Sequence, residues 1–501
     1  MNFSKIIWIA ISMGFLFFLQ SCAEDDSTLS SEDLSLTDAQ SRGPNGQGRN
    51  NGGGNDGPRN NDNNSDNGLG EPSQNNARAL SSDIVEEWSD VFLQLDRYAT
   101  GMRPNATARA IAYINLAAYE VAAPFMDRYE SQSRRLQGLR INDRERDRDA
   151  KLLVALNSAY ADVLDHFLIN VPSNVKGIIS TSESSNASLL RDGLSPSEIQ
   201  SSEEWGAYVA GQIIEYSQTD TEAEEQILSP QPLSYEPPTG PGYWTYSADP
   251  ERALFPYWKS VRTFVIGSDE TSSVPPMAYN ETQGSEYYNQ MLEVYNVNNQ
   301  AREDQGEDLW IAEFWSDDVE GLMMSPPGRQ VSIAKQLMDE NEMNLEQSLV
   351  MMLKLGFSLN DAAVSTWADK YEHMVMRPSV FLREFIDPDY QTNLYRLVYW
   401  PNPSFPGYPS GHSCFASAAA GVFIDHFGDN VTFTDRSHEG RTEFRGTPRT
   451  FDSLSEMAEE NAFSRIPLGV HIRMDCTEGL RLGYEISDAV NDLNLGRRNP
   501  S

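Results

Sequence analysis

The chain of 501 residues carries 74 acidic and 38 basic residues, which gives a formal net charge of −36 at pH 7. A field of this sign repels nucleic acid and anionic lipid headgroups, so neither is an expected partner. Hydrophobic residues make up 39% of the sequence, enough for a core in part of the chain. An anionic substrate would need a local basic pocket inside this acidic exterior.

The first 22 residues, MNFSKIIWIAISMGFLFFLQSC, combine an early lysine, an apolar stretch and small residues before a cysteine. This is the pattern of a secretory signal. Its end resembles the bacterial lipobox, which implies acylation of Cys22 and an outer-membrane lipoprotein facing the periplasm or the cell surface. An ordinary signal peptide with a chance cysteine is the alternative. Beyond residue 22 no run of about 20 apolar residues follows, so we expect membrane contact only through a lipid anchor.

Residues 23–82 form a segment rich in Asn, Gly and Asp, exemplified by GPNGQGRNNGGGNDGPRNNDNNSDNG. Such a segment cannot bury enough apolar surface to offset the entropy lost on ordering, which predicts a disordered tether. One folded domain is then expected over 83–498. It holds two further cysteines, Cys414 and Cys476, which either form a disulfide or remain as buried thiols.

Helical periodicity dominates the domain, and alternating strand patterns are scarce, so the sequence predicts a mainly α fold. The expected helices cover 106–125, 147–168, 202–217 and 345–375. The first is Ala-rich and apolar on most sides, which indicates a buried helix, and the last has a possible break near Gly356. Between 229 and 276, prolines, glycines and aromatics predict an ordered loop region on the helical body.

The first of three short patterns that carry chemistry is KYEHMVMRP, with Lys370 and Arg377. Seven helical residues turn through about 700°, within about 20° of two full turns, so both cations are expected on one helix face, about 10 Å apart. Pro378 is expected to end that helix. A solvated basic face is the alternative.

The second pattern, Pro409-Ser410-Gly411-His412, precedes a run of small helix-forming residues. A helix start offers unpaired N–H groups and a partial positive charge. Ser410 adds a hydroxyl, Gly411 a backbone N–H, and His412 a group that titrates near neutrality. The pattern is that of an anion site, although a turn that happens to contain a histidine gives the same letters.

The third pattern, SRIPLGVHIRMD, supplies Arg465, then His471 six residues later and Asp475 four residues after that. Alone, His471 could be a core histidine. Together the three patterns provide three cations, a hydroxyl and helix-start N–H groups, a cradle for a tetrahedral oxyanion such as phosphate or vanadate. Two histidines could then act as an acid–base group and as a ligand or nucleophile.

The three patterns together resemble in full the signature of the phosphatidic acid phosphatase type 2 / vanadium haloperoxidase superfamily. That signature is Lys-x6-Arg-Pro, Pro-Ser-Gly-His and Ser-Arg-x5-His-x3-Asp. Trp367, three residues before Lys370, and Phe405, seven before His412, resemble their counterparts in fungal-type vanadium chloroperoxidases and bacterial relatives. Algal bromoperoxidases carry a second histidine where Phe405 stands. Asp318 lies in a segment resembling one whose aspartate braces the active-site arginines.

This resemblance implies two packed four-helix bundles with the site between them, and vanadate as cofactor. His471 Nε2 would bind vanadium, with Asp475 nearby. The vanadate oxygens would be held by Lys370, Arg377, Ser410, Gly411 and Arg465. His412 would transfer protons and Lys370 would polarise hydrogen peroxide.

The implied activity is oxidation of a halide, iodide first and bromide next, by hydrogen peroxide to hypohalous acid. The alternative is a soluble acid phosphatase, in which His471 forms a phosphohistidine and His412 protonates the leaving group. A non-enzymatic surface lipoprotein with a relict site is a third hypothesis. The sequence does not give the oligomeric state or the organic acceptor.

Overall fold

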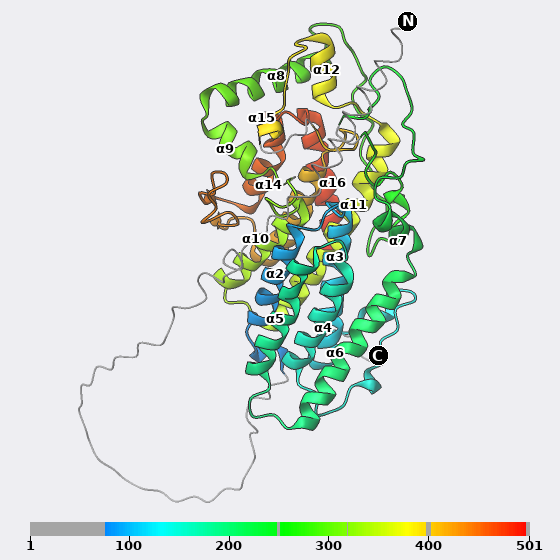
Figure 1. Ribbon diagram of the computed structural model, residues 1–501, viewed down its shortest axis with the longest axis vertical. Helices are drawn as coiled ribbons and strands as arrows, with labels where there is room; N and C mark the ends of the chain where they lie inside the picture. Colours follow the sequence, from blue (N-terminus) through cyan, green and yellow to red (C-terminus); the bar gives the residue numbers. More distant parts are fainter. Residues whose placement is uncertain (1–75, 248–250, 318, 397–401, 497–501) are drawn as a thin grey trace, which may run out of the picture. The chain divides into compact units, whose positions relative to one another are not determined.

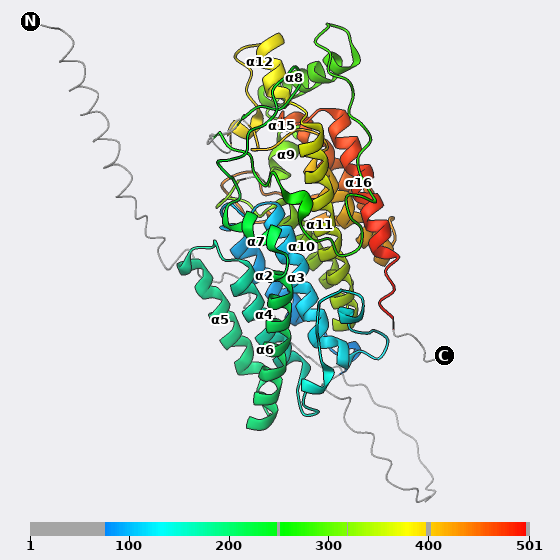
Figure 2. The same cartoon turned by 90° about the vertical axis from the view of Figure 1, so that its right-hand side faces the viewer.

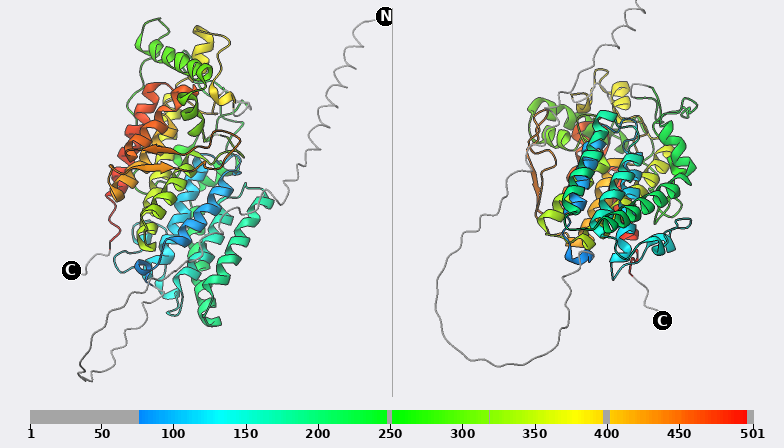
Figure 3. Two further views of the ribbon diagram at one scale, coloured as in Figure 1. Left: turned by 90° about the vertical axis from the view of Figure 1, so that its left-hand side faces the viewer. Right: turned by 60° about the horizontal axis from the view of Figure 1, so that its bottom comes forward.

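The computed structural model describes residues 76–247, 251–317, 319–396 and 402–496. The described chain is predominantly helical (Figure 1), so the expected mainly α fold is confirmed. Within the described ranges, the strands are β1 (Phe433–Asp435) and β2 (Arg449–Phe451), drawn as orange arrows in Figure 3. They pair antiparallel, with Phe433 opposite Phe451. No helix in the described ranges is both long and apolar enough to cross a membrane. The signal sequence with Cys22 and most of the predicted tether lie outside the described residues.

The first helical bundle lies in the lower half of Figure 1 and is coloured blue to green. Its helices are α2 (Asp83–Asp96), α3 (Asn105–Ala122), α4 (Leu152–Phe167), α5 (Ser173–Leu190) and α6 (Pro196–Gln218). All residues of α3 are buried, because this Ala-rich helix contacts α4, α6, α10 and α11 at once. The buried helix expected over 106–125 is thus confirmed, with the 3-10 turn Ala123–Phe125 as its end. The helices expected at 147–168 and 202–217 correspond to α4 and α6.

The second bundle consists of α11 (Leu345–His373), α13 (Gly411–Phe427), α14 (Leu454–Phe463) and α16 (Arg473–Asn491). Helix α13 lies at its centre and contacts the other three. Helix α11 also packs along α3, so the bundles lie side by side (Figures 1 and 2). The expectation of two packed bundles is confirmed, with four helices in the second bundle as expected and five in the first. Cys414 and Cys476 are both buried free thiols in this bundle.

Connecting helices surround the two bundles. They are α7 (Thr221–Leu228), α8 (Glu286–Asp304), α9 (Glu307–Phe314), α10 (Pro326–Glu340), α12 (Pro378–Phe385) and α15 (Arg465–Leu468). The remaining 3-10 turns are Ala77–Ala79, Gln132–Arg134, Asp143–Glu145, Trp258–Ser260 and Asn393–Arg396. Between 229 and 276 the described residues hold just one of these turns, as the Pro- and Gly-rich sequence predicts.

The folded chain begins earlier than the predicted boundary at residue 83. Ala77 is fully buried, and the Leu345 amide donates to the Leu80 carbonyl over 2.9 Å. Ser81 forms a β-bridge with Asn344. The end of the predicted tether therefore packs on the start of α11, because it contains the apolar side chains that the preceding Asn/Gly-rich stretch lacks.

Gly356 does not break α11, which runs without interruption from Leu345 to His373. The glycine lies where α11 crosses α3: an added Cβ would be 2.8 Å from the Cα atom of Ala112. The missing side chain therefore allows two backbones to approach closely, and the expected break is wrong. A capping box of Asn344 and Gln347 begins the helix, and Met374, with φ 50°, ends it.

Gly356→Ala should lower the free energy of unfolding by about 1–3 kcal/mol, because the new methyl group meets backbone atoms that cannot move aside. Gly211→Ala in α6 is the matched control, since an added Cβ there has no atom within 4 Å. The control should be neutral or stabilising by up to about 1 kcal/mol. Chemical denaturation measures both. Equal effects of the two substitutions would contradict the close approach of α11 and α3.

Candidate active site

Lys370 lies near the end of α11, fully buried. Its Nζ donates to the carbonyl oxygens of Pro406 (3.0 Å), Gly407 (3.2 Å) and Pro409. Burial, and next the charge of Arg377, lower the pKa of Lys370 well below its ordinary value. The lysine thus fixes the loop before α13 and brings positive charge to the start of that helix.

The seven-residue spacing predicted that Lys370 and Arg377 lie on one helix, and this prediction is wrong. Helix α11 ends at His373, and Arg377 is the N-cap of α12, with Pro378 as the first residue of that helix. Proline suits this position because its missing N–H would have no partner there. Pro378 therefore begins a helix instead of ending one, and a bend in the chain brings the two cations together.

Backbone carbonyls hold both buried arginines. Arg377 donates from Nε to the Phe405 carbonyl (3.0 Å) and from Nη1 to the Val470 carbonyl (2.9 Å). Arg465, the first residue of α15, donates from Nη1 to the carbonyls of Trp315 (2.9 Å) and Ser316 (3.4 Å). These contacts fix the two guanidinium groups without neutralising their charge.

The start of α13 has the geometry that the Pro-Ser-Gly-His pattern predicts. Ser410 is the N-cap, and its hydroxyl accepts from the Ser413 amide over 3.3 Å, so the hydroxyl proton can be donated elsewhere. Gly411 is the first helical residue, and an added Cβ would be 3.3 Å from the Trp367 ring. His412 Nε2 is 3.1 Å from the Ser316 carbonyl, which makes this nitrogen the protonated one.

His471 carries its ring proton on Nδ1, whereas His412 carries it on Nε2. Its Nδ1 is 3.0 Å from Asp475 Oδ2, and its Nε2 is 3.1 Å from Nη1 of Arg377. An arginine can only donate, so Nε2 carries the lone pair and Nδ1 carries the proton. Asp475 Oδ2 also accepts from the Ile472 amide over 3.2 Å, which fixes the carboxylate at the start of α16.

Electrostatics keep the His471 ring neutral. Burial lowers its pKa well below the ordinary value, and the charges of Arg377, Lys370, Arg465 and His412 add to that effect. Burial raises the pKa of Asp475 to about 7. His471 therefore presents an unprotonated Nε2 with its lone pair toward the cations, the form required of a metal ligand or a nucleophile.

Two aromatic rings border the cations. The centroids of Trp367 and Phe405 are 4.7 Å apart, and the Phe405 ring lies 5.2 Å from Lys370 Nζ and 5.0 Å from Arg377 Cζ. Trp367 donates from Nε1 to the Leu254 carbonyl over 3.2 Å. The two rings give the cations an apolar wall that attracts positive charge through the ring faces, and the roles of both residues stay predictions.

A buried ionic network that sequence reasoning missed supports this site. Arg329 contacts Asp317 through Nη2 (2.8 Å) and Nε (3.2 Å), and Asp435 through Nη1 (3.1 Å). It also contacts His438. All four side chains are fully buried. Arg329 follows Gly328 directly, but Asp435 and His438 lie more than 100 residues further along the chain, and contacts at that separation cannot be read from a local sequence pattern.

This network fixes the turn that carries Ser316. Asp317 follows Ser316 with φ 45°, a backbone conformation that needs support in a non-glycine residue. The Ser316 carbonyl accepts from both His412 and Arg465. Arg329 therefore positions two site residues through one turn. Asp318, the aspartate predicted to brace the arginines, lies outside the described residues, and its role stays a prediction.

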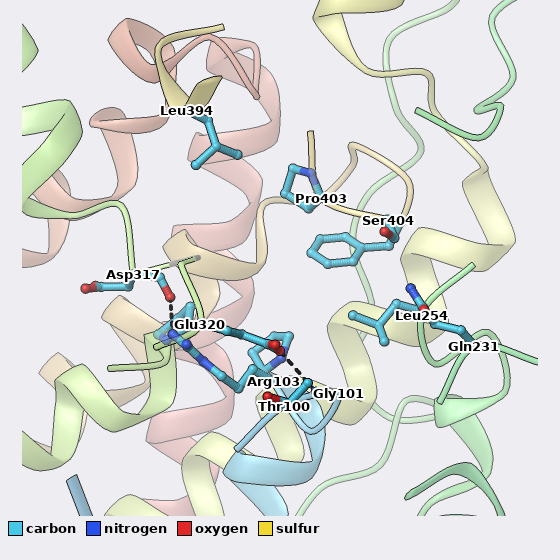
Figure 4. Close-up of a pocket in the computed structure, with 13 residues that line it drawn as sticks. Thr100, Gly101, Arg103, Gln231, Leu254, Asp317, Glu320, Leu394, Pro403 and Ser404 are labelled. Atoms are coloured by element: carbon cyan, nitrogen blue, oxygen red, sulfur yellow. Dashed lines mark hydrogen bonds between the residues drawn. The ribbon is translucent and has the colours of Figure 1, made fainter. Parts of the chain in front are cut away.

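The site lies at one end of the second bundle, where α11 ends and α13 and α16 begin. A cavity of about 250 Å³ adjoins it (Figure 4). It is lined by Phe405, by Asp317 and, between α2 and α3, by Thr100, Gly101, Arg103 and Pro104. The first bundle thus contributes to this cavity and not to the cradle itself.

The donor set fits a tetrahedral oxyanion. Three buried cations, Lys370, Arg377 and Arg465, act on the His471 ring next to the start of α13. The Asp475 carboxylate contacts Nδ1 of this ring, so it does not occupy the Nε2 side. A helix N-terminus with arginines and a hydroxyl is suited to phosphate and its structural analogues. The lone pair of His471 Nε2 adds one position for direct bonding to the central atom.

Comparison with known proteins points in the same direction. The family described as the VCPO second helical-bundle domain matches residues 350–497. Vanadium chloroperoxidase of Curvularia inaequalis is 25% identical over 213 residues, covering 32% of this chain and 35% of the relative. Vanadium-dependent bromoperoxidase of Ascophyllum nodosum is 35% identical over 95 residues, 17% of either chain. The matched part therefore spans about a third or less of these curated relatives.

Among solved structures, a bacterial vanadium-dependent iodoperoxidase superposes with a TM-score of 0.73 at 25% identity, covering 84% of this chain and 99% of that one. A bacterial vanadium-dependent chloroperoxidase in its holo form, at 17% identity and a TM-score of 0.59, shares the fold over 78% of this chain and 92% of its own. The fold and the site define a two-bundle helical protein with a buried oxyanion cradle. The matched second bundle and the superposition make the likeness more specific: residues 350–497 match the second helical bundle of vanadium chloroperoxidases, and the fold is that of a vanadium haloperoxidase.

Asp475→Asn should weaken vanadate binding about 10- to 100-fold, because an amide can donate to Nδ1 and move the His471 proton to Nε2. The measurement is equilibrium dialysis of vanadate against the full chain. Asp488→Asn, an exposed position on the same helix, is the matched control and should leave the affinity unchanged. Unaltered affinity in Asp475→Asn would show that the carboxylate does not set the ring tautomer.

Proposed function

We propose that this protein is a vanadate-dependent haloperoxidase, which oxidises a halide with hydrogen peroxide to hypohalous acid. The observation that carries the proposal is the His471 ring, held neutral with its Nε2 lone pair facing a cluster of buried cations. Vanadate meets both features, since it offers a metal for the nitrogen and charged oxygens for the cations.

His471 Nε2 would bind the vanadium atom. The oxygens would be held by Arg377, Arg465, the Ser410 hydroxyl and the Gly411 amide, with Lys370 supplying charge from the loop it fixes. When bound, vanadate supplies a Lewis-acidic centre that activates hydrogen peroxide toward attack by a halide without changing its own oxidation state. The residues of the chain then have to hold charge, exclude water and move protons.

His412 is the proton carrier in this proposal. It stands at the second position of α13, beside the hydroxyl of Ser410, with its Nε2 proton directed at the Ser316 carbonyl. The other nitrogen, Nδ1, is then the base that takes a proton from hydrogen peroxide and returns it to the departing oxygen. Lys370 Nζ lies 5.2 Å from the centroid of the Phe405 ring, and its charge would stabilise negative charge developing on peroxide oxygen.

Iodide is the proposed preferred halide, with bromide next. The solved structure with the 0.73 TM-score is that of an iodoperoxidase, and iodide is the easiest of the three halides to oxidise. The aromatic wall of Phe405 and Trp367 also favours the largest and least hydrated halide. The acid phosphatase hypothesis uses the same His471 lone pair as a nucleophile, so the discriminating experiment compares iodide oxidation with phosphate-ester hydrolysis on one sample.

We further propose that the protein is an outer-membrane lipoprotein anchored at Cys22. The support is the lipobox-like end of the signal sequence and the Asn/Gly-rich stretch after it, which would separate the enzyme from the membrane. Hydrogen peroxide and iodide would then reach the site from outside the cytoplasm.

His471→Ala should abolish tight vanadate binding and iodide oxidation together while the far-UV circular dichroism stays that of the parent. The substitution removes the direct bond to vanadium and leaves the oxygen contacts. His166→Ala, at a half-buried position in α4, is the control and should retain both properties. Full vanadium content in His471→Ala would overturn the assignment. Hydrolysis of phosphate esters with a trapped phosphohistidine, and no iodide oxidation, would favour the phosphatase.

His412→Ala should retain vanadate but lose about 10²- to 10⁴-fold in turnover, the range expected for a positioned acid–base group. Steady-state iodide oxidation across pH measures the loss, and vanadium analysis of the same samples confirms loading. The limb of the pH–rate profile that the parent owes to His412 acting as a base should also disappear. Unchanged turnover and an unchanged profile would remove His412 from proton transfer.

A further inference from the structure

The cavity beside the cradle carries a cation that the oxyanion site does not use. Arg103 lines this cavity and is only 6% exposed. Its Nη2 donates to the Asp317 carbonyl over 2.6 Å, along the wall shown in Figure 4. Its Nε and Nη1 are buried and have no hydrogen-bond partner among the described residues. Arg103 therefore brings a mostly buried positive charge to the wall of a largely apolar cavity.

The size of the cavity argues for an organic ligand. Its volume is about 250 Å³, whereas one water takes up about 30 Å³ and a cavity of about 150 Å³ accommodates benzene. A single halide would leave most of the space empty. The walls are mainly apolar and come from Leu254, Leu394, Pro403 and Phe405. A flat ring with one charged group matches this combination of volume, apolar surface and cation.

Two carboxylates narrow the choice of ligand. Asp96 interacts with Arg103 electrostatically but is bound to the Ser325 amide over 2.6 Å. Glu320 also lines the cavity and accepts from the Gly101 amide over 3.0 Å (Figure 4). Glu320 disfavours a ligand with two negative charges and favours one that also carries a neutral hydrogen-bond donor. Arginine, by contrast, matches the planar geometry of a carboxylate.

We propose that this cavity binds a hydroxyaromatic carboxylate, with the carboxylate on Arg103, and that this compound is the organic acceptor of the enzyme. The halogenation part of the proposal rests on the proposed function. Hypohalous acid formed at the cradle transfers its halogen to a ring carbon: the oxygen–halogen bond breaks, a carbon–halogen bond forms, and the ring proton leaves with hydroxide as water. The phenolic hydroxyl activates the ring for this attack.

The test uses 4-hydroxybenzoate and its neutral analogue 4-hydroxybenzamide as probes. Isothermal titration calorimetry on the full chain needs neither vanadate nor halide, so it remains informative if the proposed function fails. The parent should bind the carboxylate at least about 10-fold more tightly than the amide. Arg103→Met should weaken carboxylate binding about 10- to 100-fold, the size of a lost hydrogen-bonded charge pair. Arg134→Met, at a 77% exposed side chain, is the matched control and should bind as the parent does.

Two further variants guard against misfolding of Arg103→Met. Arg103→Lys keeps the charge but loses the fork, so it should restore binding only in part. Thr100→Trp, at an exposed position that lines the cavity, should weaken both probes by occupying space and leave Arg103 intact. On loaded enzyme, the parent should halogenate 4-hydroxybenzoate in preference to 4-hydroxybenzamide, and Arg103→Met should lose this preference.

Equal binding of the two probes, or unchanged carboxylate binding in Arg103→Met, would overturn the proposal. Binding of iodide alone, with no affinity for 4-hydroxybenzoate, would assign the cavity to halide and likewise overturn it. If the vanadate-loaded parent does not oxidise iodide but does bind 4-hydroxybenzoate, the proposed function is contradicted and the carboxylate site remains supported.

Discussion

The mutual repulsion of three buried cations is the constraint on which the rest of this structure depends. Like charges about 5 Å apart repel by about 3 kcal/mol at an effective dielectric constant of about 20, before the cost of removing each from water. The chain offsets that cost with carbonyl oxygens: the loop before α13 holds Lys370, and Val470 and the turn before Asp317 hold the arginines. Carbonyl dipoles stabilise a buried cation in a fixed position while the cation keeps its formal charge.

Such carbonyls have to come from segments far apart in sequence, and this explains why the site lies at an end of a bundle. Helix ends are the places where backbone groups are released from intrahelical bonds. Here the segment before α13, the segment between α15 and α16 and the end of α9 supply them. The second bundle packs closely because glycines lie where its helices α13 and α16 meet. This close packing holds the helix ends at fixed positions relative to one another.

The same reasoning separates what the sequence could predict from what it could not. Ser410, Gly411 and His412 were predictable because a helix cap is a local structure. The His471–Asp475 pair is also local, because Asp475 lies in the first turn of α16 and its carboxylate reaches back to the residues before that helix. The position of Arg377 was not, since the spacing that suits one helix also suits two joined by a left-handed Met374. Helix α5 was missed because only Val175, Ile179 and Ala187 are buried on it, which leaves almost no apolar period.

Arg329 and Arg103 show the limit most clearly, because both act through backbone that is remote in sequence. Arg329 holds Asp317 by its carboxylate, and Arg103 donates to the carbonyl of the same residue. One strained turn therefore faces the cradle through Ser316 and the cavity through Asp317. A change on either side of that turn is transmitted to the other through a rigid peptide plane. On the proposed chemistry, this places the acceptor next to the cradle while keeping the two anions on separate cations. The neutral hypohalous acid, which neither cation retains, is the species free to pass between them.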